Sequence, residues 1–448
     1  MRQYYNKRLN KAICIIENLC KIRAISPLCY NEITMKTLKN KCVILGVTGS
    51  IAAYKAADIA SSLAKSGCDT QVILTENGAK IIAPITFSTL TGNKCITQTF
   101  DEAVDYNVAH VALAKRADLL VIAPATANII AKLACGMADD MLTTTALACT
   151  CPKLISPAMN TAMYENPVVQ ENLSRLASQG WEIIEPDSGM LACKDIGTGK
   201  FPKPQVIVDE IWRRIARTKD MAGLRVLVTA GPTCEPIDPV RYVTNHSSGK
   251  MGYALAKSAI LRGAKVTLVS GPVSLSAFPG IDVVPVRTAQ EMYDAVTENS
   301  DSYDIIIKAA AVADYTPRSY TDHKIKKDED GDSFEHGIEF IRTKDILAAL
   351  GDKKRDGQFL CGFAMETDNL LENGKKKLGR KNADMICANS LRTAGAGFKT
   401  DTNVLTLITE DGNESLPLLS KDDAADRIFT SILRKMNEPG KPENEKNE

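Results

Sequence analysis

Two groups of small and polar residues follow apolar, strand-like runs and could hold phosphate-bearing ligands. The segment 46–52 reads Gly-Val-Thr-Gly-Ser-Ile-Ala and lies where the apolar run 41–47 ends. The segment 231–252 follows a second apolar run and contains Ser-Ser-Gly at 247–249. Helix N-termini after such turns offer free N–H groups and a favourable dipole to an anion. Phosphate binding at two separate places is therefore the first chemistry that the sequence indicates.

Neither segment matches the best-known nucleotide motifs. The first lacks the third glycine of GxGxxG, and no GxxxxGK[ST] occurs, since Gly249-Lys250 is followed by Met251. A nicotinamide dehydrogenase and a P-loop NTPase both lose support. A mononucleotide such as FMN remains open for the first segment.

Composition excludes several other classes of protein. With 55 Lys and Arg against 54 Asp and Glu, the net charge is +1, which favours neither a nucleic-acid nor a membrane partner. The 13 cysteines are scattered without a CxxC, and four histidines do not complete a zinc cluster, so most cysteines are expected to be buried thiols in a reducing cytosol. No apolar run approaches the roughly 20 residues that span a bilayer. We expect a cytoplasmic enzyme.

Alternating strand-like and helix-like runs must position the two segments. The pattern over 41–47, 51–65 and 70–74 predicts a βαβ unit. Further strands are predicted over 119–123, 153–156, 225–229, 265–269, 303–309, 359–363 and 384–388, and helices over 206–218, 253–262, 290–298 and 422–435, with a hairpin at 411–412. This rhythm predicts an α/β protein with two doubly wound, Rossmann-like domains and mainly parallel sheets.

Composition shifts divide the chain into four parts. Residues 1–40 are expected to be a dispensable basic extension, 41–219 and 220–437 the two domains, and 438–448 a disordered tail. The start at Met1 or at Met35 is left open, with a transit peptide as the alternative. The 231–252 insertion is longer than the 2–6 residues usual between strand and helix, so it is a candidate site. The charged stretch 322–335 is expected to be a mobile loop.

Within the first domain, four segments occur in a distinctive order. They are GVTGSIAAYK at 46–55, His110 followed by ADL at 117–119 and PATAN at 124–128, PAMNTAM at 157–163, and GMLAC at 189–193 with Gly197 and Gly199. Together they resemble the flavoprotein family of phosphopantothenoylcysteine decarboxylases over about 41–200. The resemblance implies a flavodoxin-like flavoprotein domain that binds FMN as an electron sink.

The resemblance also implies residue roles. Oxidation of the substrate's terminal thiol to a thioaldehyde makes its neighbouring carboxylate easy to lose, and the product is then protonated and reduced. His110 would assist oxidation and decarboxylation, Asn160 would hold the substrate carboxylate, and Cys193 would deliver the proton. The FMN contacts would be Gly49, Ser50, Thr75, Ser88, Thr126 and Asn128.

The second domain resembles phosphopantothenate-cysteine ligase over nearly its whole length. The matching segments are 229–233, 235–241, 245–252, 310–315, 324–327 and 362–367. The resemblance implies that a nucleotide activates the carboxylate of 4'-phosphopantothenate as an acyl-nucleotide, which cysteine then attacks. The bacterial-type fusion suggests CTP, with Mg²⁺, as the energy source; ATP remains the alternative, and the Mg²⁺ ligands stay unknown.

Residue roles follow from this second resemblance. Asn245 and Lys324 would be catalytic, and Ser247, Ser248 and Gly249 would anchor the phosphate of the substrate. The nucleotide site would comprise Ala309, Ala310, Asp314, Lys324, Lys344, Asp345, Ile346, Phe363, Lys377 and Lys381.

The two resemblances in this order predict a bifunctional enzyme of coenzyme A biosynthesis. They also imply a homo-oligomer, with trimers of flavin domains, dimers of ligase domains and a dodecamer overall. A flavin-binding regulatory protein is the rival from another class, but it would be marked by loss of a catalytic residue, and His110, Asn160 and Cys193 are all present.

Overall fold

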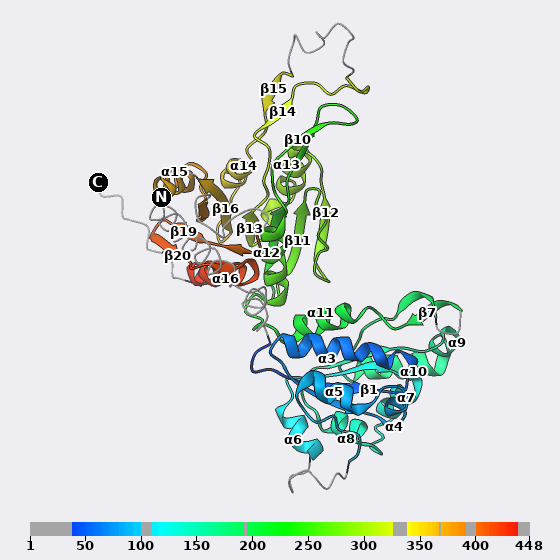
Figure 1. The fold of residues 1–448 in the computed structure, drawn as a ribbon. Helices are drawn as coiled ribbons and strands as arrows, with labels where there is room; N and C mark the ends of the chain where they lie inside the picture. Colours follow the sequence, from blue (N-terminus) through cyan, green and yellow to red (C-terminus); the bar gives the residue numbers. More distant parts are fainter. Residues whose placement is uncertain are drawn as a thin grey trace, which may run out of the picture. The chain divides into compact units, whose positions relative to one another are not determined.

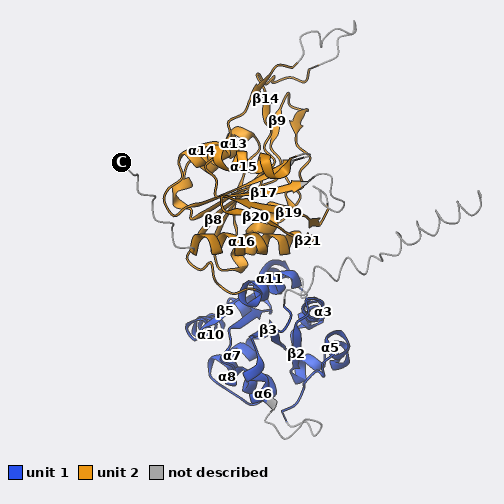
Figure 2. Cartoon of the chain, turned by 90° about the vertical axis from the view of Figure 1, so that its left-hand side faces the viewer, with its two compact units in different colours: residues 1–216 blue, residues 217–448 orange. Residues whose placement is uncertain are grey.

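The computed structural model describes residues 38–99, 109–191, 195–325, 338–366, 369–390 and 400–437. The chain divides into two compact units, 1–216 and 217–448 (Figure 2). The division falls three residues before the expected boundary, because Arg217 Nε already bonds Asp426 Oδ1 of the second unit at 3.1 Å. Several predictions concern residues that the structure does not describe. These are the predictions for the extension up to residue 37, for Cys193, for most of the charged loop and for the tail.

The sheet of the first unit is a five-stranded parallel one in the flavodoxin-like order β2-β1-β3-β4-β5. Its strands are β2 (Asp69–Leu74), β1 (Cys42–Val47), β3 (Leu119–Ala125), β4 (Lys153–Pro157) and β5 (Trp181–Ile183). Every residue of β1 is buried, as expected of a parallel strand covered on both faces. The predicted fold class is confirmed for this unit.

Helices cover both faces of this sheet (Figure 1). One layer holds α3 (Ala56–Lys65), α5 (Pro84–Thr91) and α11 (Pro204–Ile215), and the other holds α6 (Ala109–Arg116), α7 (Ala127–Ala134), α8 (Met141–Ala148) and α10 (Pro167–Ser178). The helix predicted over 51–65 begins as a 3₁₀ turn, η1 (Ile51–Lys55), before α3. Short helices α4 (Glu76–Ala79) and α9 (Thr161–Tyr164) and the hairpin β6 (Asp187–Met190)–β7 (Ile196–Lys200) complete the described part.

The second unit is built on an eight-stranded sheet in the order β12-β11-β8-β13-β16-β17-β19-β20. The strands are β12 (Asp282–Pro285), β11 (Lys265–Ser270), β8 (Arg225–Ala230), β13 (Ile305–Lys308), β16 (Phe359–Glu366), β17 (Met385–Ser390), β19 (Leu405–Thr409) and β20 (Gly412–Ser415). The first six run parallel, and the predicted hairpin adds β19 and β20 antiparallel. The chain order reverses between β8 and β13, which is where Rossmann-like sheets bind ligands.

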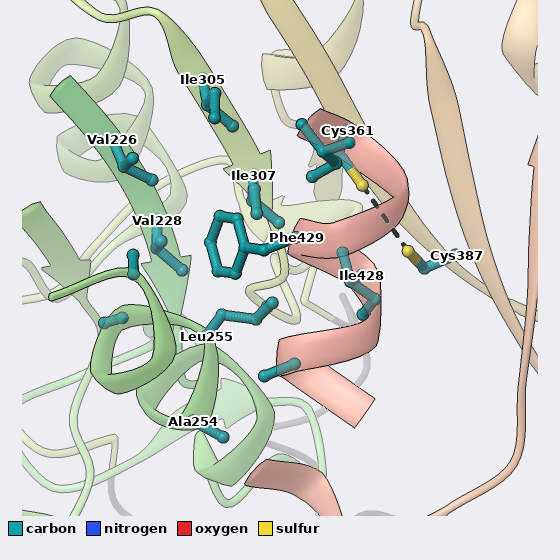
Figure 3. Packing of buried hydrophobic residues seen from close by; sticks show 14 of the residues in the cluster. Val226, Val228, Ala254, Leu255, Ile305, Ile307, Cys361, Cys387, Ile428 and Phe429 are labelled. Carbon is teal, nitrogen blue, oxygen red and sulfur yellow. Dashed lines mark hydrogen bonds between the residues drawn. The ribbon is translucent and has the colours of Figure 1, made fainter. Parts of the chain in front are cut away.

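Two helical layers also sandwich this sheet. α12 (Lys250–Leu261) and α16 (Lys421–Asn437) cover one face, and α13 (Ala289–Thr297), α14 (Ile346–Asp352) and α15 (Leu370–Arg380) cover the other. Figure 3 shows Phe429 of α16 packed between Leu255 of α12 and Ile307 of β13. Because strand side chains alternate, Ile306 belongs to the core on the opposite face.

The 231–252 insertion is folded rather than irregular, since β9 (Cys234–Pro236) and β10 (Tyr242–Thr244) pair within it. Two further small pairs are β14 (Tyr315–Pro317) with β15 (Phe340–Arg342) and β18 (Thr402–Asn403) with β21 (Leu419–Ser420), and η2 (Ser300–Ser302) precedes β13. Among the helices of the described ranges, none is both long and apolar enough to cross a bilayer.

Candidate functional site

In the first unit, three predicted cofactor residues cap helices at the carboxyl edge of the sheet. Ser50 accepts a hydrogen bond from Ala52 N at the start of η1, and Thr126 accepts one from Ile129 N at the start of α7, both at 3.4 Å. Thr75 caps α4 and also donates to Val47 O at 3.4 Å. These residues follow β1, β3 and β2, so the order reversal between β1 and β3 gathers their hydroxyls at one edge.

A buried threonine fixes the two central loops to each other. Thr48 donates from Oγ1 to Pro124 O at 2.7 Å and accepts from Thr126 N at 3.1 Å. A Cβ on Gly49 would lie 2.6 Å from Cβ of Asn77, so this position admits only glycine without a shift. The loop after β1 is thus held rigidly against the loops after β2 and β3.

Asn160 contacts Asp195, which lies close to Cys193 in the sequence. Its Oδ1 accepts from Ala162 N at 2.9 Å, capping α9, and its Nδ2 donates to Asp195 Oδ2 at 2.8 Å. Leu191 N donates to Asp195 O at 2.8 Å, which joins the described residues on either side of 192–194. The structure therefore brings Asn160 into contact with Asp195, two residues after Cys193 in the sequence, and Cys193 itself lies outside the described residues.

The other predicted residues of this unit are not gathered at that edge by any described contact. His110 lies at the start of α6, which packs against α8. Ser88 links α5 to the loop after it, donating to Pro84 O at 3.3 Å and accepting from Cys95 N at 3.0 Å. Asn128 is exposed on the first turn of α7.

The second unit contains a cavity of about 500 Å³ at the carboxyl edge of its sheet. The predicted residues that line it are Asn245, Ser247, Ser248, Gly249, Ala309, Ala310, Asp314 and Phe363. The cavity is also lined by residues that were not predicted to belong to a site, among them His246, Lys250, Lys308, Asn389, Asn403 and Lys421. Residues that follow β8 and residues that follow β13 both line the cavity, as expected where the strand order reverses between these two strands.

Hydrogen bonds hold the loops around this reversal in register. Thr229 Oγ1 accepts from Ala310 N, and Thr233 Oγ1 accepts from Ala313 N, both at 3.0 Å and both fully buried. Asn245 donates from Nδ2 to Ala311 O at 3.2 Å and to Val312 O at 3.1 Å. The exposed Asn245 is therefore fixed at the cavity mouth beside the segment after β13.

A glycine allows α12 to approach this edge closely. A Cβ on Gly252 would lie 2.5 Å from Cβ of Ala230 and 2.9 Å from Thr229 O. The N-cap Gly249 has φ 75°, a left-handed conformation that favours glycine. The N-terminus of α12 consequently lies directly over the end of β8.

The predicted nucleotide residues of α14 and α15 gather beside Lys308. Thr343 Oγ1 donates to Ala313 O at 2.7 Å, which places the following Lys344 and Asp345 near Asp314. Asp345 caps α14 and forms an ion pair with Lys381, while the Lys344 ammonium lies 4.8 Å from the ring centroid of Tyr293.

Lys308 ends β13 on this face of the sheet and has no hydrogen bond or ion pair within the described ranges. Burial, together with the positive charge of Lys377, lowers its pKa to about 8, although Asp345 and Asp314 act in the opposite direction. Lys308, Lys377, Asp345 and Asp314 are thus close enough to interact. An unpaired cation here suits a polyanionic ligand.

Lys324 is exposed, does not line the cavity, and is anchored through its neighbour. Ile325 N donates to Asp238 Oδ2 at 3.2 Å, and Arg241 Nη2 donates to Ile325 O at 2.9 Å. Hydrogen bonding to Arg241 holds the pKa of Asp238 well below its usual range. The Asp238–Arg241 pair thereby fixes the backbone from which Lys324 extends.

The missed cavity residues carried weak sequence signals. Lys308 is a cation at the end of an apolar run, a pattern that could have marked it. Asn389, Asn403 and Lys421 have polar neighbours in the sequence, and no local pattern predicts that they are only 6%, 4% and 7% exposed. Within the described ranges, no group of three or more His, Cys, Asp and Glu side chains could hold a metal ion.

Family models match nearly the whole chain. Residues 31–216 match the model described as "Flavoprotein", and residues 221–436 match "DNA/pantothenate metabolism flavoprotein C-terminal domain".

Several curated proteins similar to the chain have the name "Coenzyme A biosynthesis bifunctional protein CoaBC". That of Bacillus subtilis (strain 168) is 46% identical over 399 residues, which cover 88% of this chain and 97% of the relative. That of Vibrio cholerae serotype O1 is 44% identical over 402 residues, covering 90% and 100%. The solved structure "Crystal structure of the C-terminal Domain of Coenzyme A biosynthesis bifunctional protein CoaBC" is 43% identical, with a TM-score of 0.42, and covers 50% of this chain and 100% of that one.

Proposed function

The chain belongs to the family of coenzyme A biosynthesis bifunctional proteins, and from this premise we propose how its two units divide the work. It is a bifunctional enzyme with phosphopantothenate-cysteine ligase and phosphopantothenoylcysteine decarboxylase activities. We assign the decarboxylase to residues 38–216 and the ligase to 217–437. The match of a flavoprotein model to 31–216 supports this division.

In the ligase unit, the proposed first step joins the substrate carboxylate to the nucleotide. A carboxylate oxygen attacks the α-phosphorus of CTP and pyrophosphate leaves, which gives an acyl-cytidylate. Asn245, held at the cavity mouth by Ala311 O and Val312 O, orients the acyl group. The amine of cysteine then attacks the acyl carbon and CMP leaves. Holding the reactants at a fixed edge supplies proximity, which lowers the barrier of both steps.

Negative charge on the nucleotide has to be neutralised during this transfer. The proposed cations are Lys377 of α15, Lys381 directly after this helix, Lys344 and the exposed Lys324, and Mg²⁺ would add a further charge on the phosphates. Asp314 would contact the ribose or base, with Ala309, Ala310, Ile346 and Phe363 lining the site. CTP is the proposed nucleotide, and ATP is the alternative that the experiment below tests.

In the decarboxylase unit, the residues at the β1/β3 reversal fit FMN. Ser50 and Thr126 accept hydrogen bonds from helix N-termini, which leaves their own O–H groups free to donate to a phosphate. Bound there, FMN would supply a two-electron sink that makes the substrate carboxylate easy to lose. Gly49, Thr75, Ser88 and Asn128 are the other proposed contacts.

The chain's own residues would hold the substrate and move its protons. Asn160, already a donor to Asp195, would bind the substrate carboxylate through the same amide. Cys193, two residues before Asp195 in the sequence, would deliver a proton to the product carbon. His110 would accept or donate a proton during oxidation and decarboxylation.

The 500 Å³ cavity at the strand reversal of the second unit carries the ligase proposal, because it unites Asn245, the Ser-Ser-Gly segment and Asp314. The test supplies purified protein with 4'-phosphopantothenate, cysteine, Mg²⁺ and CTP, then identifies products by mass spectrometry. 4'-Phosphopantetheine is expected, and a chelator should stop ligation. Product with ATP alone would overturn CTP as the nucleotide, and no product with either would overturn the ligase site.

A homo-oligomer is also proposed, with flavin-unit trimers, ligase-unit dimers and a dodecamer. Exposed apolar side chains support it: Ile51 (64%) and Ile85 (69%) in the first unit, and Tyr315 (50%) and Phe340 (43%) on β14 and β15. Apolar surface of this kind is typical of interfaces. Native mass spectrometry should give twelve subunits, and a monomer would contradict the proposal.

A further inference from the structure

Asp195 places a carboxylate on the amide that is proposed to hold the carboxylate of the decarboxylase substrate. Asn160 Nδ2 donates to Asp195 Oδ2 at 2.8 Å, while Asn160 Oδ1 accepts from Ala162 N at 2.9 Å. The oxygen of this amide is committed to the start of α9, so its nitrogen is the end that can donate to a carboxylate. A substrate carboxylate bound there has a second carboxylate as its neighbour.

The surrounding backbone fixes this arrangement. Met159 N donates to Gly199 O at 3.1 Å, so β7 lies against the segment that carries Asn160. A Cβ on Gly199 would lie 2.5 Å from Met159 O, which shows how closely the two backbones approach. Asp195 directly precedes β7, and its O accepts from Leu191 N at 2.8 Å. The contact between Asp195 and Asn160 therefore follows from close packing of β7 on this segment.

Two carboxylates on one amide nitrogen repel each other. Two acceptors of one NH₂ group lie about 5 Å apart, because each is about 2.9 Å from the nitrogen and the two N–H bonds diverge by about 120°. Asp195 is exposed, so water reduces the repulsion without removing it. A site that only has to bind a carboxylate would be expected to offer a cation instead. The charge of Asp195 therefore disfavours the bound substrate.

Loss of carbon dioxide removes this repulsion. After the thiol has been oxidised to a thioaldehyde, the bond between the carboxylate carbon and its neighbour breaks, and neutral carbon dioxide leaves. The electron pair of that bond passes to the sulfur of the thioaldehyde, which gives an ene-thiolate. Negative charge thus moves away from the carboxylate that Asp195 faces. An interaction that is unfavourable in the bound substrate and weaker in the transition state accelerates the step.

We propose that the negative charge of Asp195 destabilises the bound substrate carboxylate and so accelerates its loss as carbon dioxide. This role rests on the proposed binding of that carboxylate by Asn160. Contacts with the remainder of the substrate offset the repulsion during binding. A carboxylate that only orients Asn160 would have a different kinetic signature, because its removal would weaken substrate binding.

Decarboxylation of supplied 4'-phosphopantothenoylcysteine by the full-length, flavin-loaded protein tests this role. Asp195→Asn keeps an oxygen that can accept from Asn160 but removes the charge. Both kcat and KM should fall, each about three- to tenfold, which is the pattern expected when strain is removed from the bound substrate. A substitution that merely disturbed the fold would not lower KM.

A second readout does not depend on turnover. 4'-Phosphopantothenoylserine keeps the carboxylate but has a hydroxyl in place of the thiol, so it cannot form a thioaldehyde. Its inhibition constant should fall about three- to tenfold in Asp195→Asn. The inhibition constant of 4'-phosphopantetheine, which has no carboxylate, should change less than about twofold.

Asp187→Asn is the matched control. Asp187 is also exposed and begins β6, where it pairs with Lys200 at the opposite end of the β6–β7 pair from Asp195. The same loss of charge there should leave kcat, KM and both inhibition constants unchanged. Flavin absorbance reports on folding of the first unit in every variant, and ligation reports on the second.

A rise in KM, or unchanged kcat and KM, in Asp195→Asn would overturn the proposal, since Asp195 would then only orient Asn160 or have no role. Where Asp195→Asn forms no measurable product, an unchanged inhibition constant for 4'-phosphopantothenoylserine would overturn it. Failure of the premise is distinguishable. Asn160→Ala should weaken inhibition by 4'-phosphopantothenoylserine about tenfold, and no change there would contradict the proposed role of Asn160 itself.

Discussion

At the scale of single residues, Lys308 combines a cost in stability with a proposed role in binding. Its ammonium is partly buried at the end of β13 without an ion pair in the described ranges. Such a charge costs free energy unless a ligand pairs with it. We therefore expect that the empty site is the less stable state and that nucleotide binding relieves this cost.

Lys308→Met should raise KM for CTP about tenfold and increase the free energy of unfolding of the second unit by about 1–3 kcal/mol at pH 7. The folded pKa is about 8, below that of an unfolded lysine, so the cost is complete below pH 8. Between these two pKa values the unfolded state binds more protons, and wild-type stability rises with pH. The gain from the substitution should therefore vanish above about pH 10.

Denaturant unfolding at pH 7 and pH 10 checks this prediction, and the CTP dependence of ligation checks the binding role. A loss of stability at pH 7 would contradict the assignment of Lys308 as an unpaired buried cation. If KM for CTP were unchanged in Lys308→Met, Lys308 would affect stability alone and would have no role in nucleotide binding.

Two further substitutions, His110→Asn and Cys193→Ser, test the proposed proton-transfer residues of the decarboxylase. Each should slow decarboxylation about 100-fold or more, the usual loss when a proton-transfer group is removed, and leave ligation intact. 4'-Phosphopantothenoylcysteine should then accumulate, as mass spectrometry would detect. Normal decarboxylation in both variants would refute the assigned site.

At the scale of elements, the approach of α12 to β8 depends on Gly252. Gly252→Ala would force α12 away, because the new Cβ meets Ala230 at 2.5 Å. We expect a loss of about 1–3 kcal/mol in stability and a lower kcat/KM for ligation. Thermal unfolding and ligation assays test both effects.

Gly379→Ala is the matched control for this substitution. Gly379 lies within α15 and its added Cβ would meet nothing within 4 Å. Removal of a helical glycine should stabilise the unit by about 0.5–1 kcal/mol. Equal behaviour of the two alanine variants would show that the packing of α12 on β8 is not critical.

Apolar patterns in the sequence predicted the positions of the strands closely. Parallel strands covered on both faces appear as continuous apolar runs, and β1, β8 and β11 were predicted within about one residue of their observed ends. Helix starts were less accurate: α12 begins at Lys250 rather than 253, because Gly252 in its first turn lies against the end of β8 and adds no apolar side chain to the amphipathic repeat. The initial 3₁₀ turn of η1 was likewise missed.

At the scale of the whole molecule, Leu38 belongs to the packed part of the first unit. Leu38 is fully buried, and its N–H donates to Ser66 O at 3.1 Å. The predicted dispensable extension of 1–40 therefore includes a residue that belongs to the first unit, and we now place its end no later than residue 37.

A chain that starts at Met35 should retain both activities, whereas one that starts at Lys41 should lose stability. Leu38→Ala in the full chain should cost about 2–5 kcal/mol, as do other buried leucines. Thermal unfolding of the first unit measures both changes. Equal stability of the Met35 and Lys41 versions would contradict a structural role for Leu38.

The sequence by itself determined the fold class, the two units and the segments that resemble known catalytic ones, because these are written in local apolar periodicity and short motifs. It did not determine which polar side chains meet in the ligase cavity. Asn245 and Lys421 are far apart in the chain and line one cavity only because the strand order reverses between β8 and β13. Burial of Asn389, Asn403 and Lys421 is likewise a property of packed helices and strands, so only the tertiary structure could reveal it.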